Sequence, residues 1–222
     1  MNEFVQTFFN LDVLAQVWPL LAQGLWMTLL LALASVPLAM ALGLAVAVAQ
    51  DGPRRWLRML LVAYVDVLRA IPPLVLLIFI YFGLPFLGVK LDEMSAAILA
   101  LVLNGSSYFA EIFRAGLEAV GKGQREAARS TGLTHLQTMA HVVIPQGLRA
   151  MLPDIISNTV ELVKQTSIAS AVALQELLRS AQLAQGVVYN PTPLVAAALI
   201  YFLLFWPFVR LVSRLQHRVA NA

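Results

Sequence analysis

Cysteine is absent from the 222 residues, and charged residues are scarce. Lys, Arg, Asp and Glu make up 12% of the chain, against roughly 25% in a soluble domain. The lack of cysteine excludes disulfides, a thiol nucleophile and a cysteine-ligated metal. Hydrophobic residues instead make up 60%, and the mean hydropathy is +0.79. This composition predicts a membrane protein.

The first long apolar run is preceded by no lysine or arginine. Only Glu3 and Asp12 carry charge there, whereas a cleaved signal peptide begins with a basic segment. We therefore expect residues 1–20 to form a helix in the outer membrane interface, with Phe4 and Phe8 on its apolar side.

Long runs without charge predict the membrane spans. A helix needs about 20 mostly apolar residues to cross the hydrocarbon core. We expect an all-α integral membrane protein of one domain, 1–222, with five spans. The spans are expected at about 24–49, 56–85, 94–120, 145–174 and 194–209. The second is expected to break at Pro72-Pro73, because proline cannot continue the helical hydrogen bonds.

The distribution of lysine and arginine predicts the orientation. With the N-terminus outside and the C-terminus in the cytoplasm, ten of these 15 residues face inward, which follows the positive-inside rule. The ten are Arg54, Arg55, Arg58, Lys122, Arg125, Arg129, Arg149, Arg210, Arg214 and Arg218. Lys90 and Arg179 face outward, and Arg69, Arg114 and Lys164 lie within spans. The bias accounts for the net charge of +3, so we infer no nucleic-acid partner.

The connection between the third and fourth spans, 121–147, is therefore expected in the cytoplasm, and its pattern is that of two short helices. The run 126–128, Glu-Ala-Ala, favours a helix, and Gly132 stands where a glycine often ends one. Thr134 and Gln137 fit a capping box that starts a second helix. Small residues at the tip of such an elbow favour the docking of another protein. The alternative is a solvated connector.

A phosphate-binding loop is nearly matched by GLEAVGKG, Gly116–Gly123. Gly123 stands where a Ser or Thr hydroxyl must bind Mg²⁺, and a membrane helix stands where a strand should precede the loop. We expect no ATP site in this chain.

The stretch EAARSTGLTHLQTMAHVVIP resembles the EAA loop of permease subunits of ATP-binding-cassette (ABC) importers. Its Glu-Ala-Ala is followed after three residues by Gly132, and after nine more by a hydrophobic-x-hydrophobic-Pro ending at Pro145. The segments YVDVLRAIPPLVLLIFIYFGLP, SSYFAEIFRAGL and NTVELVKQTSIAS are similar to the second, third and fourth spans of polar-amino-acid permeases. This chain departs from the family at two places. It has Arg-Ala-Ile-Pro at 69–72, where several relatives have Arg-Gly-Thr-Pro, and Lys-Gln-Thr-Ser at 164–167, where they often have Lys-Asp-Thr-Ser.

This resemblance implies the transmembrane permease subunit of an ABC importer for polar amino acids in a bacterial inner membrane. It implies four kinds of partner: ATPase subunits, a second permease (identical or different), an extracytoplasmic amino-acid-binding protein and the surrounding lipid. The ATPases use ATP and Mg²⁺, and this chain itself binds no cofactor. The residues that it assigns to ATPase coupling are Glu126, Ala127, Ala128, Gly132 and Leu133.

Four acid–base pairs at i,i+3 spacing lie in or beside the spans: Asp66–Arg69, Glu111–Arg114, Glu161–Lys164 and Glu176–Arg179. A lone charge at the membrane centre costs at least about 2.5 kcal/mol, so mutual neutralisation is one explanation. The other is a path for an amino acid, whose carboxylate and ammonium need both signs. The residues that we assign to such a path are Asp66, Arg69, Glu161, Lys164, Gln165, Thr166 and Ser167.

Two other classes of protein remain to be weighed. A channel or ion-coupled secondary transporter would use the charged pairs but would not need the elbow loop. An intramembrane hydrolase would need a base beside its nucleophile. The three histidines, His135, His141 and His217, all fall in segments expected in the cytoplasm, so we predict no catalytic residues and no metal ligands.

Small residues mark one face of the first span. Ala39, Gly43 and Ala47 recur at four-residue spacing, which suits close contact between helices. Either the bundle itself or a second membrane subunit would cover this face.

Overall fold

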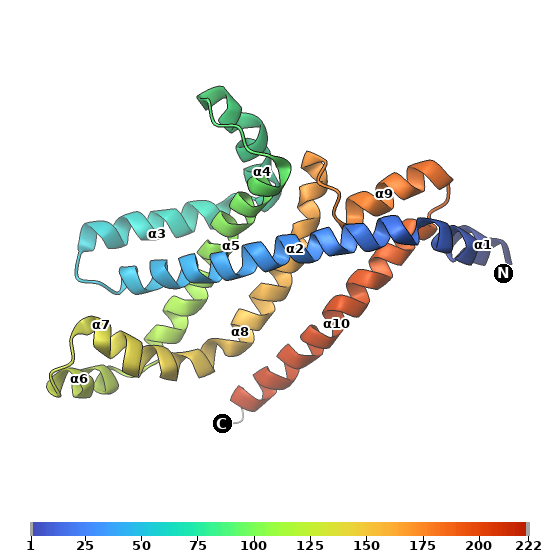
Figure 1. Ribbon diagram of the computed structural model, residues 1–222. Helices are drawn as coiled ribbons and strands as arrows, with labels where there is room; N and C mark the ends of the chain where they lie inside the picture. Colours follow the sequence, from blue (N-terminus) through green and yellow to red (C-terminus); the bar gives the residue numbers. More distant parts are fainter. Residues whose placement is uncertain (1, 221–222) are drawn as a thin grey trace. The chain divides into compact units, whose positions relative to one another are not determined.

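The computed structural model describes the backbone of residues 2–220, and every described element is a helix or a helical turn. The side chains of residues 2, 149–150 and 215–220 are outside the described set, so Arg149, His217 and Arg218 are not placed. Figure 1 labels the helices in chain order. Their bounds are α1 Asn2–Phe8, α2 Leu11–Gln50, α3 Arg55–Ala70, α4 Pro73–Ile78, α5 Glu93–Glu118, α6 Lys122–Ser130, α7 His135–Thr138, α8 Ile144–Gln165, α9 Leu177–Val188 and α10 Thr192–Ala220.

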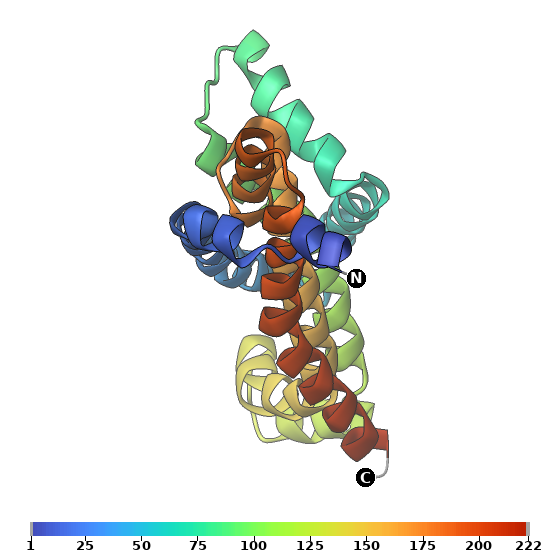
Figure 2. The same cartoon turned by 90° about the vertical axis from the view of Figure 1, so that its right-hand side faces the viewer.

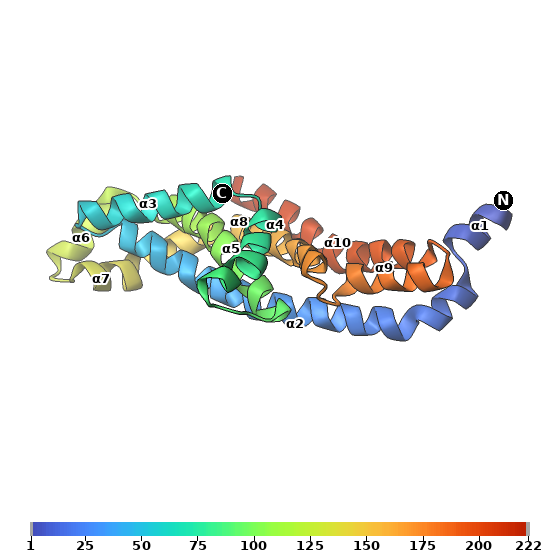
Figure 3. The same ribbon diagram turned by 90° about the horizontal axis from the view of Figure 1, so that it is seen from above.

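The chain divides into two compact units that share its long helices. Unit 1 comprises the residues up to 36 together with 72–101 and 160–208. In its core Val17 and Leu21 of α2 pack with Leu177 and Ala181 of α9 and with Ala197 of α10. Figure 3 shows α9 beside α10 in this unit. Burial of these apolar faces stabilises the unit.

Unit 2 comprises residues 37–71, 102–159 and the part from 209 onward. Val46 of α2, Val65 of α3 and Ala110 of α5 form a core cluster there. A Cβ at Gly43 would lie 2.6 Å from the Phe109 Cβ and 2.9 Å from the Ser106 carbonyl oxygen. The small-residue face of α2 therefore packs against α5 of the same chain. The bundle itself, and not a second membrane subunit, covers this face.

Three described helices are long and apolar enough to cross a membrane, or four if a broken pair counts as one span. The three are Glu3–Gln50 (α1 and α2 taken as one stretch), Glu93–Glu118 and Thr192–Arg214, and the broken pair is Arg55–Ala70 with Pro73–Leu87. Figure 2 shows α10 as one continuous helix. The charged residues of α8 keep it out of this set, so the count of five spans remains a prediction.

The segment 1–20, expected to form one interfacial helix, is divided between two helices, while its location at the membrane interface stays a prediction. Only α1 is a separate helix, because α2 begins at Leu11 and runs without interruption to Gln50. Val17 and Leu21 are buried at 6% and 0% exposure. Packing against α9 and α10 thus extends the helix through a segment that we expected to lie apart from the span.

The break expected at Pro72-Pro73 is present. α3 ends at Ala70, and Ile71 and Pro72 have extended backbone angles (ψ 124° and 136°) before α4 begins. The helix α9, by contrast, was not expected. Its N-cap is Glu176, which is outside the Ser, Thr, Asp and Asn residues that usually announce a helix start.

Candidate functional site: a two-helix elbow and a charged cavity

The segment 121–147 folds as α6, a glycine turn and α7, and then continues through a π-helical turn, Met139–Val143, into α8 (Figure 2). Gly132 has φ +89°, a left-handed conformation that side chains resist. The capping box is formed: the Gln137 backbone N–H donates to Thr134 Oγ1 over 3.3 Å, and the Thr134 N–H donates to Gln137 Oε1 over 2.9 Å. The sequence pattern therefore predicted this local geometry correctly.

The coupling residues assigned by resemblance differ in exposure. Glu126, Ala127 and Gly132 are exposed, and Leu133 is half-buried. Ala128 is 8% exposed and packs inside the elbow. Leu136, which we did not single out from the sequence, is 69% exposed on α7. A single exposed apolar side chain is common on protein surfaces, so Leu136 counts toward a docking surface only together with the exposed residues of α6.

An ionic clamp, Asp51–Arg125, links this elbow to the turn between α2 and α3. Arg125 Nη1 donates to both carboxylate oxygens of Asp51 at 3.1 and 3.0 Å, and its Nη2 donates to the Leu117 carbonyl over 2.7 Å. His135 Nε2 lies 3.6 Å from Asp51 Oδ2. The Arg58 guanidinium donates to the carbonyls of Gln50 and Gly52 in the same turn. These contacts tie α6 and the start of α7 to the C-terminal end of α2.

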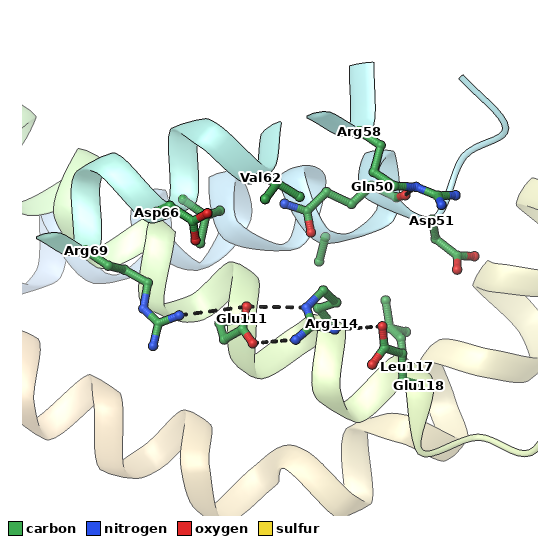
Figure 4. A pocket seen from close by; sticks show the side chains of 12 residues that line it. Gln50, Asp51, Arg58, Val62, Asp66, Arg69, Glu111, Arg114, Leu117 and Glu118 are labelled. Atoms are coloured by element: carbon green, nitrogen blue, oxygen red, sulfur yellow. Dashed lines mark hydrogen bonds and ion pairs between the residues drawn. The ribbon is translucent and has the colours of Figure 1, made fainter. Parts of the chain in front are cut away.

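A charged cavity of about 480 Å³ lies between α2, α3 and α5 of unit 2 (Figure 4). Arg69 Nη1 lies 3.9 Å from Glu111 Oε2, and its guanidinium carbon is 5.4 Å from the centre of the Tyr108 ring. Arg114 bonds Glu111 and also Glu118, the latter over 2.7 Å. Glu111 is therefore shared by two arginines, in an ion ladder along α5.

The partner of Arg69 differs from the one expected. No ion pair or hydrogen bond joins the Asp66 carboxylate to Arg69 or to another described side chain, although both residues line the cavity. The longer Glu111 side chain reaches Arg69 from the neighbouring helix. The Glu111–Arg114 pair forms as predicted. Asp66 is left exposed in the cavity, and among the described residues no group of three acids or histidines is suited to a metal.

Asn104 supports the end of α3, directly after Arg69. Its Nδ2 donates to the Leu68 carbonyl over 2.9 Å and to the Ile71 carbonyl over 3.4 Å. In an unbroken helix the Leu68 carbonyl would accept from the N–H of residue 72, which proline lacks. Asn104 is completely buried. This role was not predicted, although an asparagine within an apolar span is a signal for it.

The remaining assigned residues lie in unit 1, at the end of α8. Lys164 Nζ contacts Glu161 Oε2, and the two side chains are 48% and 53% exposed. The Thr166 hydroxyl is buried and donates to the Val163 carbonyl, and the Ser167 hydroxyl donates to the Lys164 carbonyl. Gln165 Oε1 is buried and has no hydrogen-bond partner among the described residues. The ion pair is therefore the most exposed part of this set, and both hydroxyls donate to backbone carbonyls of the same segment.

Glu176 does not form the ion pair with Arg179 that its spacing predicted. Its carboxylate instead accepts the backbone N–H groups of Leu178 and Arg179 at 2.9 and 2.7 Å, and the Tyr201 hydroxyl donates to it over 2.9 Å. Glu176 is completely buried. A buried carboxylate satisfied by three donors is a structural helix cap.

Comparison with known proteins agrees with this architecture. The family model for the binding-protein-dependent transport system inner membrane component matches residues 36–221. The chain is 37% identical over 215 residues to the probable glutamine ABC transporter permease protein GlnP of Bacillus subtilis (strain 168), covering 95% of this chain and 96% of that protein. It is 34% identical over 199 residues to the arginine transport system permease protein ArtQ of the same organism, with coverage of 88% and 91%.

A solved structure has the same fold. The crystal structure of an amino acid ABC transporter with histidines contains a chain that is 35% identical, with a TM-score of 0.82 and coverage of 92% of this chain and 96% of that one. The fold, the family match and the length of the similarity agree. The chain therefore belongs to the family of binding-protein-dependent transport system inner membrane components, the multi-pass permease subunits of ABC transporters.

Proposed function

We propose that this chain carries a polar amino acid across the inner membrane, with five spans, the N-terminus outside and the C-terminus in the cytoplasm. It holds no cofactor and catalyses no reaction, because a partner ATPase supplies the energy. The observation that carries the proposal is similarity over nearly the whole chain to permeases named for glutamine and arginine. Gln165 stands where relatives often have an aspartate, so the proposal names polar amino acids as a class and not one amino acid.

The elbow is proposed as the ATPase contact. The elbow presents an acidic, a small and a large apolar side chain to the ATPase, those of Glu126, Ala127 and Leu136. The Asp51–Arg125 clamp then passes motion of the partner to α2. A second permease copy or paralogue and an external amino-acid-binding protein complete the proposed importer.

The cargo contacts are proposed at the two exposed charged sites. Asp66 has no ionic partner among the described residues, so it is available to an ammonium group. The Glu161–Lys164 pair is half-exposed, and a cargo that carries both charges can exchange with its two members. Desolvated charges left without partners cost several kcal/mol, so each site discriminates among cargoes by charge.

The test is uptake of labelled amino acids into vesicles that contain the reconstituted complex, with binding protein in excess and ATPase activity measured in parallel. We expect Lys164→Met and Asp66→Asn to abolish uptake or to reorder the preferred amino acids while the complex still assembles. Glu161→Gln is expected to weaken transport of cationic and zwitterionic cargo more than anionic cargo. Thr159→Ser, on the same helix, is the control.

Normal uptake rates and an unchanged order of preferred amino acids in all three charge variants would show that these side chains only balance charge within the helix bundle. Uptake that needs a proton gradient and persists without ATP would instead support a secondary transporter. Purification from native membranes with mass identification of the associated chains tests the partners separately.

A further inference from the structure

Two adjoining cavities of unit 2 differ in chemistry. The first, an apolar groove of about 730 Å³, follows the last turns of α2 past Ala41 and Ala45 and has Arg54 at its edge. The second, a basic pocket of about 490 Å³, lies under α6. Gly52, Pro53 and His135 line both. The apolar groove and the basic pocket are therefore neighbours that share these three residues as lining.

The basic pocket carries an excess of positive charge. Four cationic side chains line it against two carboxylates, those of Asp51 and Glu126. Arg125 is occupied by Asp51. Among the described residues, Lys122, Arg129 and the nearby Arg54 have no ion pair. An anionic group is the complement that this end of the site lacks.

The apolar groove lies on a part of α2 that has no charge for many residues. Residues 13–50 are uncharged, and the side chains of Ala41 and Ala45 are exposed although apolar. Trp56, just beyond the turn, is 63% exposed. Exposed tryptophan is enriched where a span meets the headgroup region. These features indicate that the α2 wall of the groove lies in the hydrocarbon and the basic pocket beside the headgroups. The opposite wall of the groove is formed by His135 and Leu136 of α7, at the side of the elbow that faces the membrane.

We infer that the groove and the pocket together bind one anionic phospholipid. An acyl chain lies along Ala41 and Ala45, and the phosphate lies between Arg54 and the basic pocket. Basic pockets between helices at the membrane surface bind anionic headgroups. An acidic protein partner would fill the basic pocket alone, and a zwitterionic lipid would fill the groove alone. The combination of the two is what an anionic lipid matches.

The test is native mass spectrometry of the purified complex after incubation with dioleoylphosphatidylglycerol or dioleoylphosphatidylcholine at equal concentration. We expect preferential retention of phosphatidylglycerol, and a loss of about fivefold in that retention for Arg54→Gln. Arg55→Gln is the matched control, because Arg55 carries the same charge one residue away and lines neither cavity. Ala45→Phe fills the groove without a change of charge and is expected to reduce retention of both lipids.

Equal retention of the two lipids by the wild type would overturn the inference, as would equal losses from Arg54→Gln and Arg55→Gln. Loss of the preference on addition of inorganic phosphate alone would show that the pocket binds a free anion and would likewise overturn it. Gel filtration of each variant complex establishes that assembly is intact.

Discussion

Gly132 illustrates how a single residue shapes the elbow. Its φ of +89° is left-handed, and the space around it is open, since no heavy atom comes within 4 Å of an added Cβ. The constraint on this position is therefore conformational and not steric. Gly121, at the other end of α6, also has open space but has φ −53°.

This contrast makes the two glycines a matched pair. Gly132→Ala is expected to destabilise the elbow by about 1–2 kcal/mol, the strain of a left-handed alanine, and to lower the amount of cargo imported per ATP hydrolysed. Gly121→Ala is expected to change neither quantity. Parallel measurement of uptake and ATPase activity in vesicles checks this, and equal behaviour of both variants would contradict the conformational argument.

Asn104 is a second residue whose role rests on one group, the side-chain Nδ2 that donates to two backbone carbonyls. Asn104→Leu removes the donor to the Leu68 carbonyl, and we expect a loss of about 1–3 kcal/mol in the free energy of unfolding for the unsatisfied group. Ser107→Ala is the control, because Ser107 is equally buried on α5 and donates only to the Asn104 carbonyl within that helix. Denaturant unfolding in detergent compares the two, and equal losses would argue against a specific cap.

At the scale of elements, the decisive contact is the Asp51–Arg125 clamp between the α2–α3 turn and α6. Asp51→Asn is expected to lower uptake several-fold while ATP hydrolysis continues, because α6 then moves without α2. Exchange of the two residues, Asp51→Arg with Arg125→Asp, is expected to restore part of the uptake. Asp92→Asn, at the start of α5, is the control, since asparagine caps a helix as well as aspartate. If uptake does not recover in the double variant, the two residues act independently and not through their ion pair.

Helices and helix ends were predictable where the sequence carries a local signal. Uncharged runs predicted most of α2, α5 and α10, the proline pair predicted the break after α3, and the Thr134–Gln137 spacing predicted the capping box. Contacts between distant segments were not predictable. Asp51 and Arg125 are 74 residues apart, and Arg69 pairs with Glu111 of another helix rather than with its neighbour Asp66. Local spacing sets which charges share a face, but packing decides which of them meet.

At the scale of the whole molecule, the orientation of the chain decides which partner can reach each end of a span. The expected orientation rests on ten basic residues on one side against two on the other. It places the elbow beside the ATPase and Asp92 on the side of the binding protein. Asp92 is accessible, and a hydrogen bond from Ser95 holds the pKa of its carboxyl below its ordinary value. The absence of cysteine means that one introduced thiol reports one position.

The last prediction uses this property. Gln137 is exposed on α7. A cysteine in its place is expected to react with a membrane-impermeant maleimide only after the cells are permeabilised, so that the reagent reaches the cytoplasmic side. A cysteine that replaces Asp92 is expected to react in intact cells. The cysteine-free wild type is the control for background labelling. Because an ATPase has access only from the cytoplasm, the reverse pattern would remove the elbow from its partner and would refute both the orientation and the proposed coupling.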